Sequence, residues 1–231
     1  MSDKHHSHSH DHSHSHSHGH SHDHMPHDFS QEHMIKRFEN EERDTIHHFS
    51  DTLFPKLREL LEAVAPDAVG VDIGGGTGFV ARKLASFPGL CKRVYSADSS
   101  RKMIEFAEKK LAEHPDLAEK VVPLVCGESE LTTLPERVDF IVSVDVYHHL
   151  KNHAEYFRRL AKENCNGNAI LLLIDYKPGK LMKDGEEYGP KESWNVKVSA
   201  LDVAKTIADS WTLVHRVDLD YHYNLFFLKT Q

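Results

Sequence analysis

From residue 68 onward, short apolar segments alternate with segments of helical periodicity, and this alternation restricts the possible folds strongly. The apolar segments, rich in Val, Ile and Leu, predict strands at residues 69–73, 93–97, 121–126, 138–144 and 169–174. Helical patterns cover residues 77–86, 100–113, 154–162 and 200–209. Because parallel strands require crossover connections, which helices commonly supply, the alternation predicts an α/β protein with a mostly parallel sheet and helices on both faces.

The end of the chain departs from this pattern. Two strand-like runs, residues 212–217 and 223–229, follow one another with only a short turn between them. A connection this short cannot cross over between parallel neighbours, whereas antiparallel strands need only a turn. The sequence therefore predicts an antiparallel pair appended to the parallel sheet.

Composition and charge exclude several classes of function. The chain carries 36 acidic residues against 28 Lys plus Arg, for a net charge of -8, which argues against a protein that binds nucleic-acid phosphates. No apolar stretch has the roughly 18 to 20 residues needed to cross a bilayer, and the N-terminus lacks the apolar core of a signal peptide. Three scattered cysteines, Cys91, Cys126 and Cys165, form neither a disulfide framework nor a metal motif. We therefore expect a cytoplasmic protein that does not bind membranes.

A glycine-rich turn after the first predicted strand is the main indication of function. Its sequence, residues 71–79, is Val-Asp-Ile-Gly-Gly-Gly-Thr-Gly-Phe. Glycines allow a ligand to approach the backbone closely, and open parallel sheets bind ligands at the carboxyl ends of their strands. The spacing is not that of a dinucleotide fingerprint, since Phe79 occupies the sixth position, and the Lys of a phosphate loop is absent. An ordinary tight turn is the alternative.

This turn and the segments after it resemble class I S-adenosylmethionine (SAM)-dependent methyltransferases. Asp98, at the end of the second strand, matches the acid that holds the ribose hydroxyls, and Met103 matches an apolar position beside the adenine. Gly127-Glu128-Ser129-Glu130 resembles the loop after the third strand, with Glu128 in place of the usual Asp. The resemblance implies a Rossmann-like, doubly wound sheet of seven strands, mostly parallel, with a C-terminal antiparallel strand. It implies that the cofactor contacts Asp72, Gly74, Gly76, Gly78, Asp98, Ser99, Met103, Glu128, Ser129 and Asp145.

Two adjacent histidines follow the fourth predicted strand, in Asp145-Val-Tyr-His-His-Leu. In the family this place lies near the reacting methyl group, and a histidine can accept a proton near neutral pH. We therefore expect His148 or His149 to act as the base, although a local packing or capping role is the alternative for each. Asp145 either contacts the cofactor or begins the following helix. The resemblance favours small-molecule methyl acceptors.

The chain divides into three expected regions. Residues 1–27 contain almost no apolar side chains, so they form a disordered tail. Residues 28–66 form N-terminal helices, at 30–48 and 51–64, that cap the cofactor site. The methyltransferase domain spans residues 67–231, in which residues 188–199 contribute to a lid.

The tail concentrates the histidines of the chain. Imidazole is a good ligand for nickel and zinc, so the segment predicts binding of divalent metal ions. The repeat is irregular, whereas a purification tag usually has a contiguous run of histidines. The expected ligands are His5, His6, His8, His10, His12, His14, His16, His18, His20, His22 and His24.

Two functions of different classes fit these features. The first is a methyltransferase that acts on a small molecule and carries a metal-binding tail. The alternative is a metal-handling or interaction protein whose methyltransferase domain binds cofactor without catalysing transfer. A protein-methylating enzyme is a third possibility, disfavoured because no substrate-docking domain is recognisable. The sequence does not identify the methyl acceptor.

Overall fold

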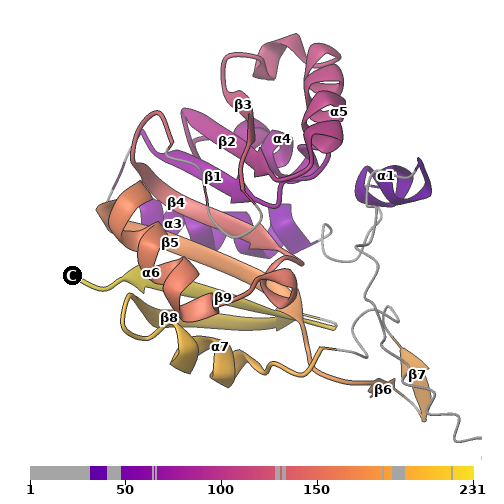
Figure 1. The fold of residues 1–231 in the computed structure, drawn as a ribbon, viewed down its shortest axis with the longest axis vertical. Coiled ribbons are helices and arrows are strands. Elements are labelled where there is room, and N and C mark those ends of the chain that lie inside the picture. The colour runs from indigo at the N-terminus through magenta and orange to yellow at the C-terminus, as the bar shows by residue number, and fades with distance from the viewer. Residues whose placement is uncertain are drawn as a thin grey trace, which may run out of the picture.

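The computed structural model describes residues 32–40, 48–63, 65, 67–127, 131, 134–183, 185–188, 196–219 and 221–231. The expected tail, residues 1–27, lies outside these residues. Figure 1 shows the elements in chain order. They are α1 (Glu32–Phe38), η1 (Phe49–Leu53), α3 (Phe54–Glu62), β1 (Val69–Ile73), α4 (Phe79–Ser86), β2 (Arg93–Asp98), α5 (Arg101–Ala112), η2 (Pro115–Leu117), β3 (Val121–Val125), β4 (Val138–Val144), η3 (Tyr147–His149), α6 (His153–Asn164), β5 (Cys165–Tyr176), β6 (Leu181–Lys183), β7 (Glu186–Tyr188), α7 (Ala200–Thr206), β8 (Trp211–Leu219) and β9 (His222–Lys229).

A seven-stranded sheet with the order β3-β2-β1-β4-β5-β9-β8 forms the centre of the fold. The first five of these strands pair in parallel, and β9 runs antiparallel to both β5 and β8. The expected fold class is therefore confirmed. The C-terminal pair of strands joins the sheet through β9, which lies between β5 and β8, so β8 forms the edge.

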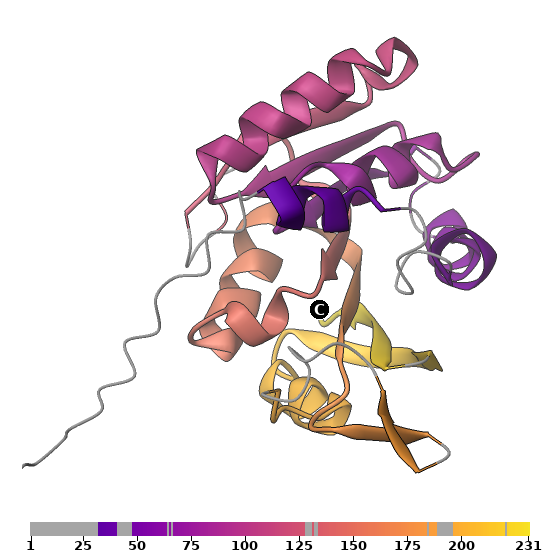
Figure 2. The ribbon, with the colours of Figure 1, turned by 90° about the vertical axis from the view of Figure 1, so that its right-hand side faces the viewer.

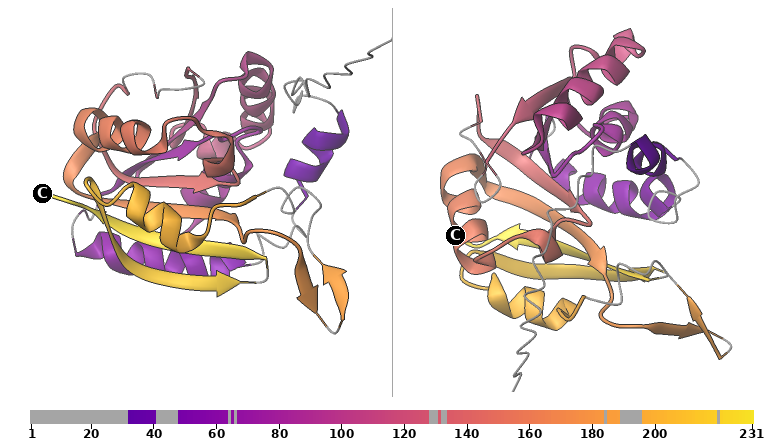
Figure 3. Two further views of the ribbon diagram at one scale, coloured as in Figure 1. Left: turned by 60° about the horizontal axis from the view of Figure 1, so that its bottom comes forward. Right: turned by 45° about the vertical axis from the view of Figure 1, so that its right-hand side comes forward.

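Both faces of the central strands β1, β4 and β5 are buried, as their apolar sequences predict, whereas the edge strand β8 is mostly exposed. Alternate side chains of β5 enter opposite cores: Leu171 and Leu173 pack with Phe157 of α6, while Ile170 and Leu172 pack with α3 and α4. Figures 1 and 3 show α6 and α7 on one face and α3 on the other. Full burial of each such Leu stabilises the fold by about 1.5–3 kcal/mol, so the two layers hold the sheet rigidly.

The N-terminal helices differ from their expected bounds. Within the segment 30–48, helix α1 is followed by a turn at Glu39, and His48 is again helical. The expected helix at 51–64 is divided, because a single π-helical turn, η1, precedes α3. Phe54 N–H donates to Phe49 O, five residues back, and Pro55 has no N–H for the next bond. The α-helical pattern therefore starts anew at Phe54.

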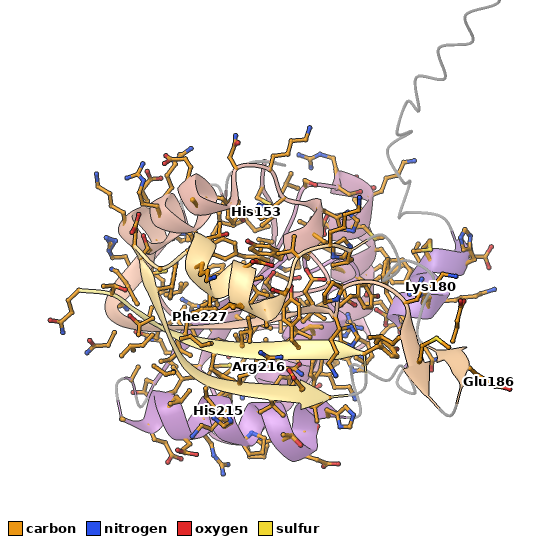
Figure 4. The ribbon with its side chains drawn as sticks, turned by 90° about the horizontal axis from the view of Figure 1, so that it is seen from below. His153, Lys180, Glu186, His215, Arg216 and Phe227 are labelled. Atoms are coloured by element: carbon orange, nitrogen blue, oxygen red, sulfur yellow. The ribbon has the colours of Figure 1, made fainter. Side chains whose placement is uncertain are left out.

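A small hairpin after β5 has no counterpart in the predicted elements. Strands β6 and β7 pair antiparallel to each other and are separate from the main sheet. Figure 2 shows the hairpin projecting from the body, and Figure 4 shows Lys180 at its base and Glu186 at its outer part. The expected lid at 188–199 begins at the end of this hairpin, but residues 189–195 lie outside the described residues.

Candidate cofactor and acceptor site

The carboxyl ends of β1 and β2 carry the glycine turn and Asp98 side by side. Strand β1 ends at Ile73, which pairs with Ala97, one residue before Asp98. Gly75 N–H donates to Ala97 O at 3.0 Å, so the turn folds over the end of β2. Gly74 and Gly76 have φ values of +67° and +53°, which L-residues with a side chain rarely adopt.

The space around these glycines differs from one to the next. A Cβ on Gly74 would lie 2.4 Å from Val146 Cγ2, so this glycine permits close packing against the loop after β4. Among the described residues, a Cβ on Gly76 would meet only Gly74 O, at 4.0 Å. Val146 therefore occupies the space beside Gly74, whereas the space beside Gly76 is open, so that a ligand has room to lie against the backbone there.

Asp98 is held against this open position. Its Oδ2 accepts a hydrogen bond from Gly76 N–H at 2.9 Å, and its Oδ1 accepts one from Ser100 N–H at 2.8 Å. Burial raises the pKa of Asp98, and these two backbone hydrogen bonds lower it by a smaller amount. Each carboxylate oxygen has two lone pairs, so both can still accept a hydrogen bond from a ligand hydroxyl.

Asp72 and its neighbours lie beneath the same turn. Asp72 is buried in β1, and its Oδ2 is 3.1 Å from the position of a Cβ on Gly75. Thr77 Oγ1 and Ser96 Oγ are buried and find no hydrogen-bond partner among the described residues. Gly78, with a φ of +74°, ends the turn directly before α4. Buried polar atoms normally have partners, so this concentration at one turn indicates a place for a polar ligand.

The remaining expected cofactor residues divide into three groups. Ser99 is exposed directly after Asp98, while Met103 is buried on α5. Glu128 and Ser129 lie outside the described residues. Asp145, at the end of β4, has a φ of +57°, and its Oδ1 lies 2.9 Å from His222 Nε2. The carboxylate of Asp145 thus lies against His222 of β9.

The expected base, His148, is paired with a carboxylate at the end of β5. His148 Nδ1 lies 2.7 Å from Asp175 Oδ1, and Asp175 Oδ2 accepts from His148 N–H at 3.0 Å. Asp175 is completely buried, whereas His149 is exposed, with its ring centroid 4.0 Å from that of His148. His153 stacks on Tyr147 and holds the turn η3 that carries both histidines.

The pKa of His148 reflects competing effects. Burial lowers it, but the hydrogen bond and negative charge of Asp175, together with the charge of Asp145, outweigh burial and raise it above 6.5. The ring therefore takes up a proton more readily than an isolated histidine does.

Sequence reasoning missed the part of this site that β9 contributes. Tyr176 pairs with His222 across β5 and β9, and the Tyr176 hydroxyl donates to Asp145 Oδ2 at 3.3 Å. Because β9 runs antiparallel to β5, the start of β9 lies beside the end of β5. His222, at the start of β9, therefore reaches the edge of the sheet where β4 and β5 end. The predicted antiparallel pair placed His222 in the turn directly before the last strand, but it did not specify which strand of the sheet the pair would join.

The fold and this arrangement together define a class of protein. The strand order, the glycine turn after β1 and the acid at the end of β2 are those of a class I methyltransferase. A family model described as "Methyltransferase domain" matches residues 71–170. Residues 71–170 therefore match a methyltransferase domain, and the chain has the fold of class I, SAM-dependent methyltransferases.

Several solved structures share the fold. A SAM-dependent methyltransferase from Aquifex aeolicus is 23% identical, with a TM-score of 0.58 and coverage of 80% of this chain and 97% of that chain. Magnesium protoporphyrin IX methyltransferase from Synechocystis PCC 6803 with bound SAM is 17% identical, with a TM-score of 0.60 and coverage of 87% and 93%. The CcbJ methyltransferase from Streptomyces caelestis is also 17% identical, with a TM-score of 0.57 and coverage of 77% and 90%. A comparison with curated proteins found no match.

Two further observations concern metals and membranes. Among the described residues, no group of three or more His, Cys, Asp or Glu side chains is arranged to hold a metal ion. The histidine-rich segment lies outside that search. Within the described part of the chain, no helix is both long enough and apolar enough to span a membrane.

Proposed function

We propose that this protein transfers a methyl group from SAM to a small-molecule acceptor. The observation that carries the proposal is the Asp98 carboxylate, which is fixed by Gly76 N–H beside an open backbone position. A carboxylate at that place suits the two ribose hydroxyls of SAM, and the glycine backbone allows the methionine part to pass closely. SAM supplies a methyl group on a positively charged sulfur.

The proposed cofactor contacts are those that the resemblance implies. Asp98 and Ser99 would bind the ribose, Met103 would pack near the adenine, and Glu128 and Ser129 would approach the adenine edge. The turn and Asp72 would hold the methionine part, with Asp72 acting directly or through water. The contacts comprise Asp72, Gly74, Gly76, Gly78, Asp98, Ser99, Met103, Glu128, Ser129 and Asp145.

The acceptor would bind at the neighbouring ends of β4 and β5. His148 and His149 lie there, two and three residues beyond Val146, which packs on Gly74 of the cofactor turn. A base at this place can remove the acceptor's proton while the protein aligns the acceptor with the methyl group. One of the similar structures is named as a methyltransferase of magnesium protoporphyrin IX and another as a pyocyanin biosynthetic protein, and both names support this acceptor class.

Replacing Asp98 tests the cofactor site. Asp98→Ala removes both carboxylate oxygens, so we expect SAM and S-adenosylhomocysteine to bind more than tenfold more weakly, a loss of about 1.4 kcal/mol or more. Isothermal titration calorimetry on the full chain measures both affinities. Asp116→Ala, at an exposed residue of η2, is the matched control and should bind as the wild type does. Equal affinities for the two variants would refute the ribose assignment.

The alternative is a cofactor-binding protein without catalysis that handles metals or binds other proteins. It predicts SAM binding but no transfer of labelled methyl to any acceptor. The His148–Asp175 pair favours the enzyme, because a non-catalytic domain has no use for an oriented base. A screen of acceptors with methyl-labelled SAM distinguishes the two functions.

The histidine-rich tail is proposed as a separate site for nickel or zinc. Alternating histidines offer many exchangeable imidazole ligands, and most are neutral at pH 7. This role is independent of methyl transfer, since the proposed cofactor contacts all lie in residues 72–145.

A further inference from the structure

The ends of β4, β5 and β9 bring two histidine–carboxylate pairs together. His148 bonds to Asp175 and His222 bonds to Asp145, at 2.7 and 2.9 Å. The Tyr176 ring lies between the pairs, with its centroid 5.6 Å from that of His148 and 4.7 Å from that of His222. The two pairs differ in exposure: the His222 side chain is 3% exposed, whereas that of His148 is 16% exposed. Only His148 combines a carboxylate partner with substantial access from outside.

The orientation of Asp175 determines which nitrogen of His148 is available. Asp175 Oδ1 accepts from Tyr176 N–H at 2.7 Å, and Oδ2 accepts from His148 N–H at 3.0 Å. The two backbone donors fix the plane of the carboxylate, and an ionised carboxylate only accepts hydrogen bonds. Nδ1 of His148 must therefore carry the proton in this pair, which leaves the lone pair on Nε2.

We propose that Nε2 of His148 is the base for a hydroxyl acceptor and that Asp175 is the positioning residue that fixes its tautomer. This inference rests on the proposed function and chooses between the two expected histidines. The acceptor O–H bond breaks and its proton goes to Nε2. The oxygen lone pair bonds to the methyl carbon while the carbon–sulfur bond of SAM breaks, and that electron pair stays on sulfur. Asp175 offsets the charge of the resulting imidazolium, which later releases its proton to water.

The same geometry indicates the class of acceptor. A carboxylic acid is already ionised at neutral pH and needs no base, and it would meet the negative charges of Asp145 and Asp175. A thiol ionises appreciably without help, whereas a hydroxyl with a pKa of about 10 or more keeps its proton. Among oxygen and sulfur acceptors, an oriented base is therefore of greatest use to a hydroxyl.

The surrounding charges support this role for His148. The groups that face it are Asp175 and Tyr176 from β5, Asp145 from the end of β4, and the neighbouring His149. Asp145 acts over a longer distance, and its carboxylate is held by Tyr176 and His222. Negative charge on two sides favours the imidazolium that proton transfer creates.

The tautomer of His148 can be measured without knowing the natural acceptor. Nitrogen-15 NMR of the full chain, with His148 assigned from the signals missing in His148→Gln, should show a neutral ring protonated at Nδ1. In Asp175→Asn this preference should be lost, while His114→Gln and Asp116→Asn, exposed controls near η2, should leave the His148 signals unchanged. A neutral wild-type ring protonated at Nε2 would overturn the proposal.

A pair of phenols tests the base itself. With methyl-labelled SAM, His148→Gln should lower transfer to phenol by on the order of 10²-fold or more, the usual effect of removing a base. Transfer to 4-nitrophenol, which ionises far more readily than phenol near neutral pH, should fall less than tenfold. Equal losses for both phenols, or transfer to benzoate and not to phenol, would overturn the proposal.

Calorimetry separates this proposal from the one on which it rests. SAM should bind equally well to wild type, His148→Gln and Asp175→Asn, because neither side chain is a cofactor contact. Absence of SAM binding by the wild type would refute the proposed function. Normal SAM binding with an Nε2-protonated His148 would refute only the assignment of the base.

Discussion

Two glycines with similar backbone conformations allow the cofactor turn to be tested by a single added methyl group. Gly76, in the turn after β1, has a φ of +53°, and Gly89, in the exposed turn after α4, has a φ of +69°. In the part of the chain that the structure describes, a Cβ on Gly89 would meet nothing within 4 Å, and one on Gly76 would meet only Gly74 O at 4.0 Å. Replacing either by Ala therefore strains the backbone without creating a clash within the protein.

The expected magnitudes follow from this comparison. An L-residue with a side chain in the left-handed region costs about 1–2 kcal/mol, so both variants should lower the free energy of unfolding by that amount. Only Gly76→Ala places its methyl where SAM is proposed to lie against the backbone, next to Asp98. We expect this variant to bind SAM more than tenfold more weakly, which corresponds to about 1.4 kcal/mol or more.

Urea unfolding and isothermal titration calorimetry measure the two effects separately. The account predicts similar stabilities for Gly76→Ala and Gly89→Ala but weak SAM binding for the first alone. If both variants bound SAM as the wild type does, the turn around Gly76 would not be the cofactor site. If both lost binding equally, the loss would follow from instability and the local argument would fail.

Three further predictions concern other parts of the chain. Deleting residues 1–27 should abolish binding of nickel and zinc in equilibrium dialysis and leave SAM affinity unchanged; equal metal uptake by the truncated chain would contradict the tail proposal. Glu39→Gln should lower the free energy of unfolding by about 1–3 kcal/mol, because it leaves the buried Arg82 without its 2.7 Å ion pair; a change below 0.5 kcal/mol in urea unfolding would contradict this. Because the pKa of His148 is raised in the folded chain, its stabilising contribution is full below pH 6.5 and is lost as the pH rises through the raised pKa. The stability gap between wild type and His148→Gln in urea should therefore narrow with rising pH, and a gap independent of pH would refute the reasoning.

The elements that the sequence predicted well are those specified by local patterns. Strands β1, β2 and β4 have nearly the expected bounds because each is a short, largely apolar run between segments of different pattern. The turn at Gly74–Gly78 was recognisable because left-handed backbone conformations require glycine. Asp98 was found for a similar reason, since its place at the end of a strand next to that turn follows from the order of the strands.

The features that the sequence did not predict depend on contacts between distant segments. The pairing of Asp175 with His148 is one such feature, since it depends on the register of β4 and β5. His222 reaches the site because β9 inserts next to β5, which no local pattern specifies. The break between η1 and α3 at Phe54 could have been predicted from the sequence, because Pro55 cannot donate a backbone hydrogen bond.

The most direct test of the central claim is a crystal structure of the full chain with S-adenosylhomocysteine. The account predicts that both ribose hydroxyls lie within hydrogen-bond distance of the Asp98 carboxylate, with the amino-acid part along Gly74–Gly78. The ligand's sulfur should face the ends of β4 and β5, on the side of His148. A ligand bound elsewhere, or a ribose that does not contact Asp98, would contradict the account.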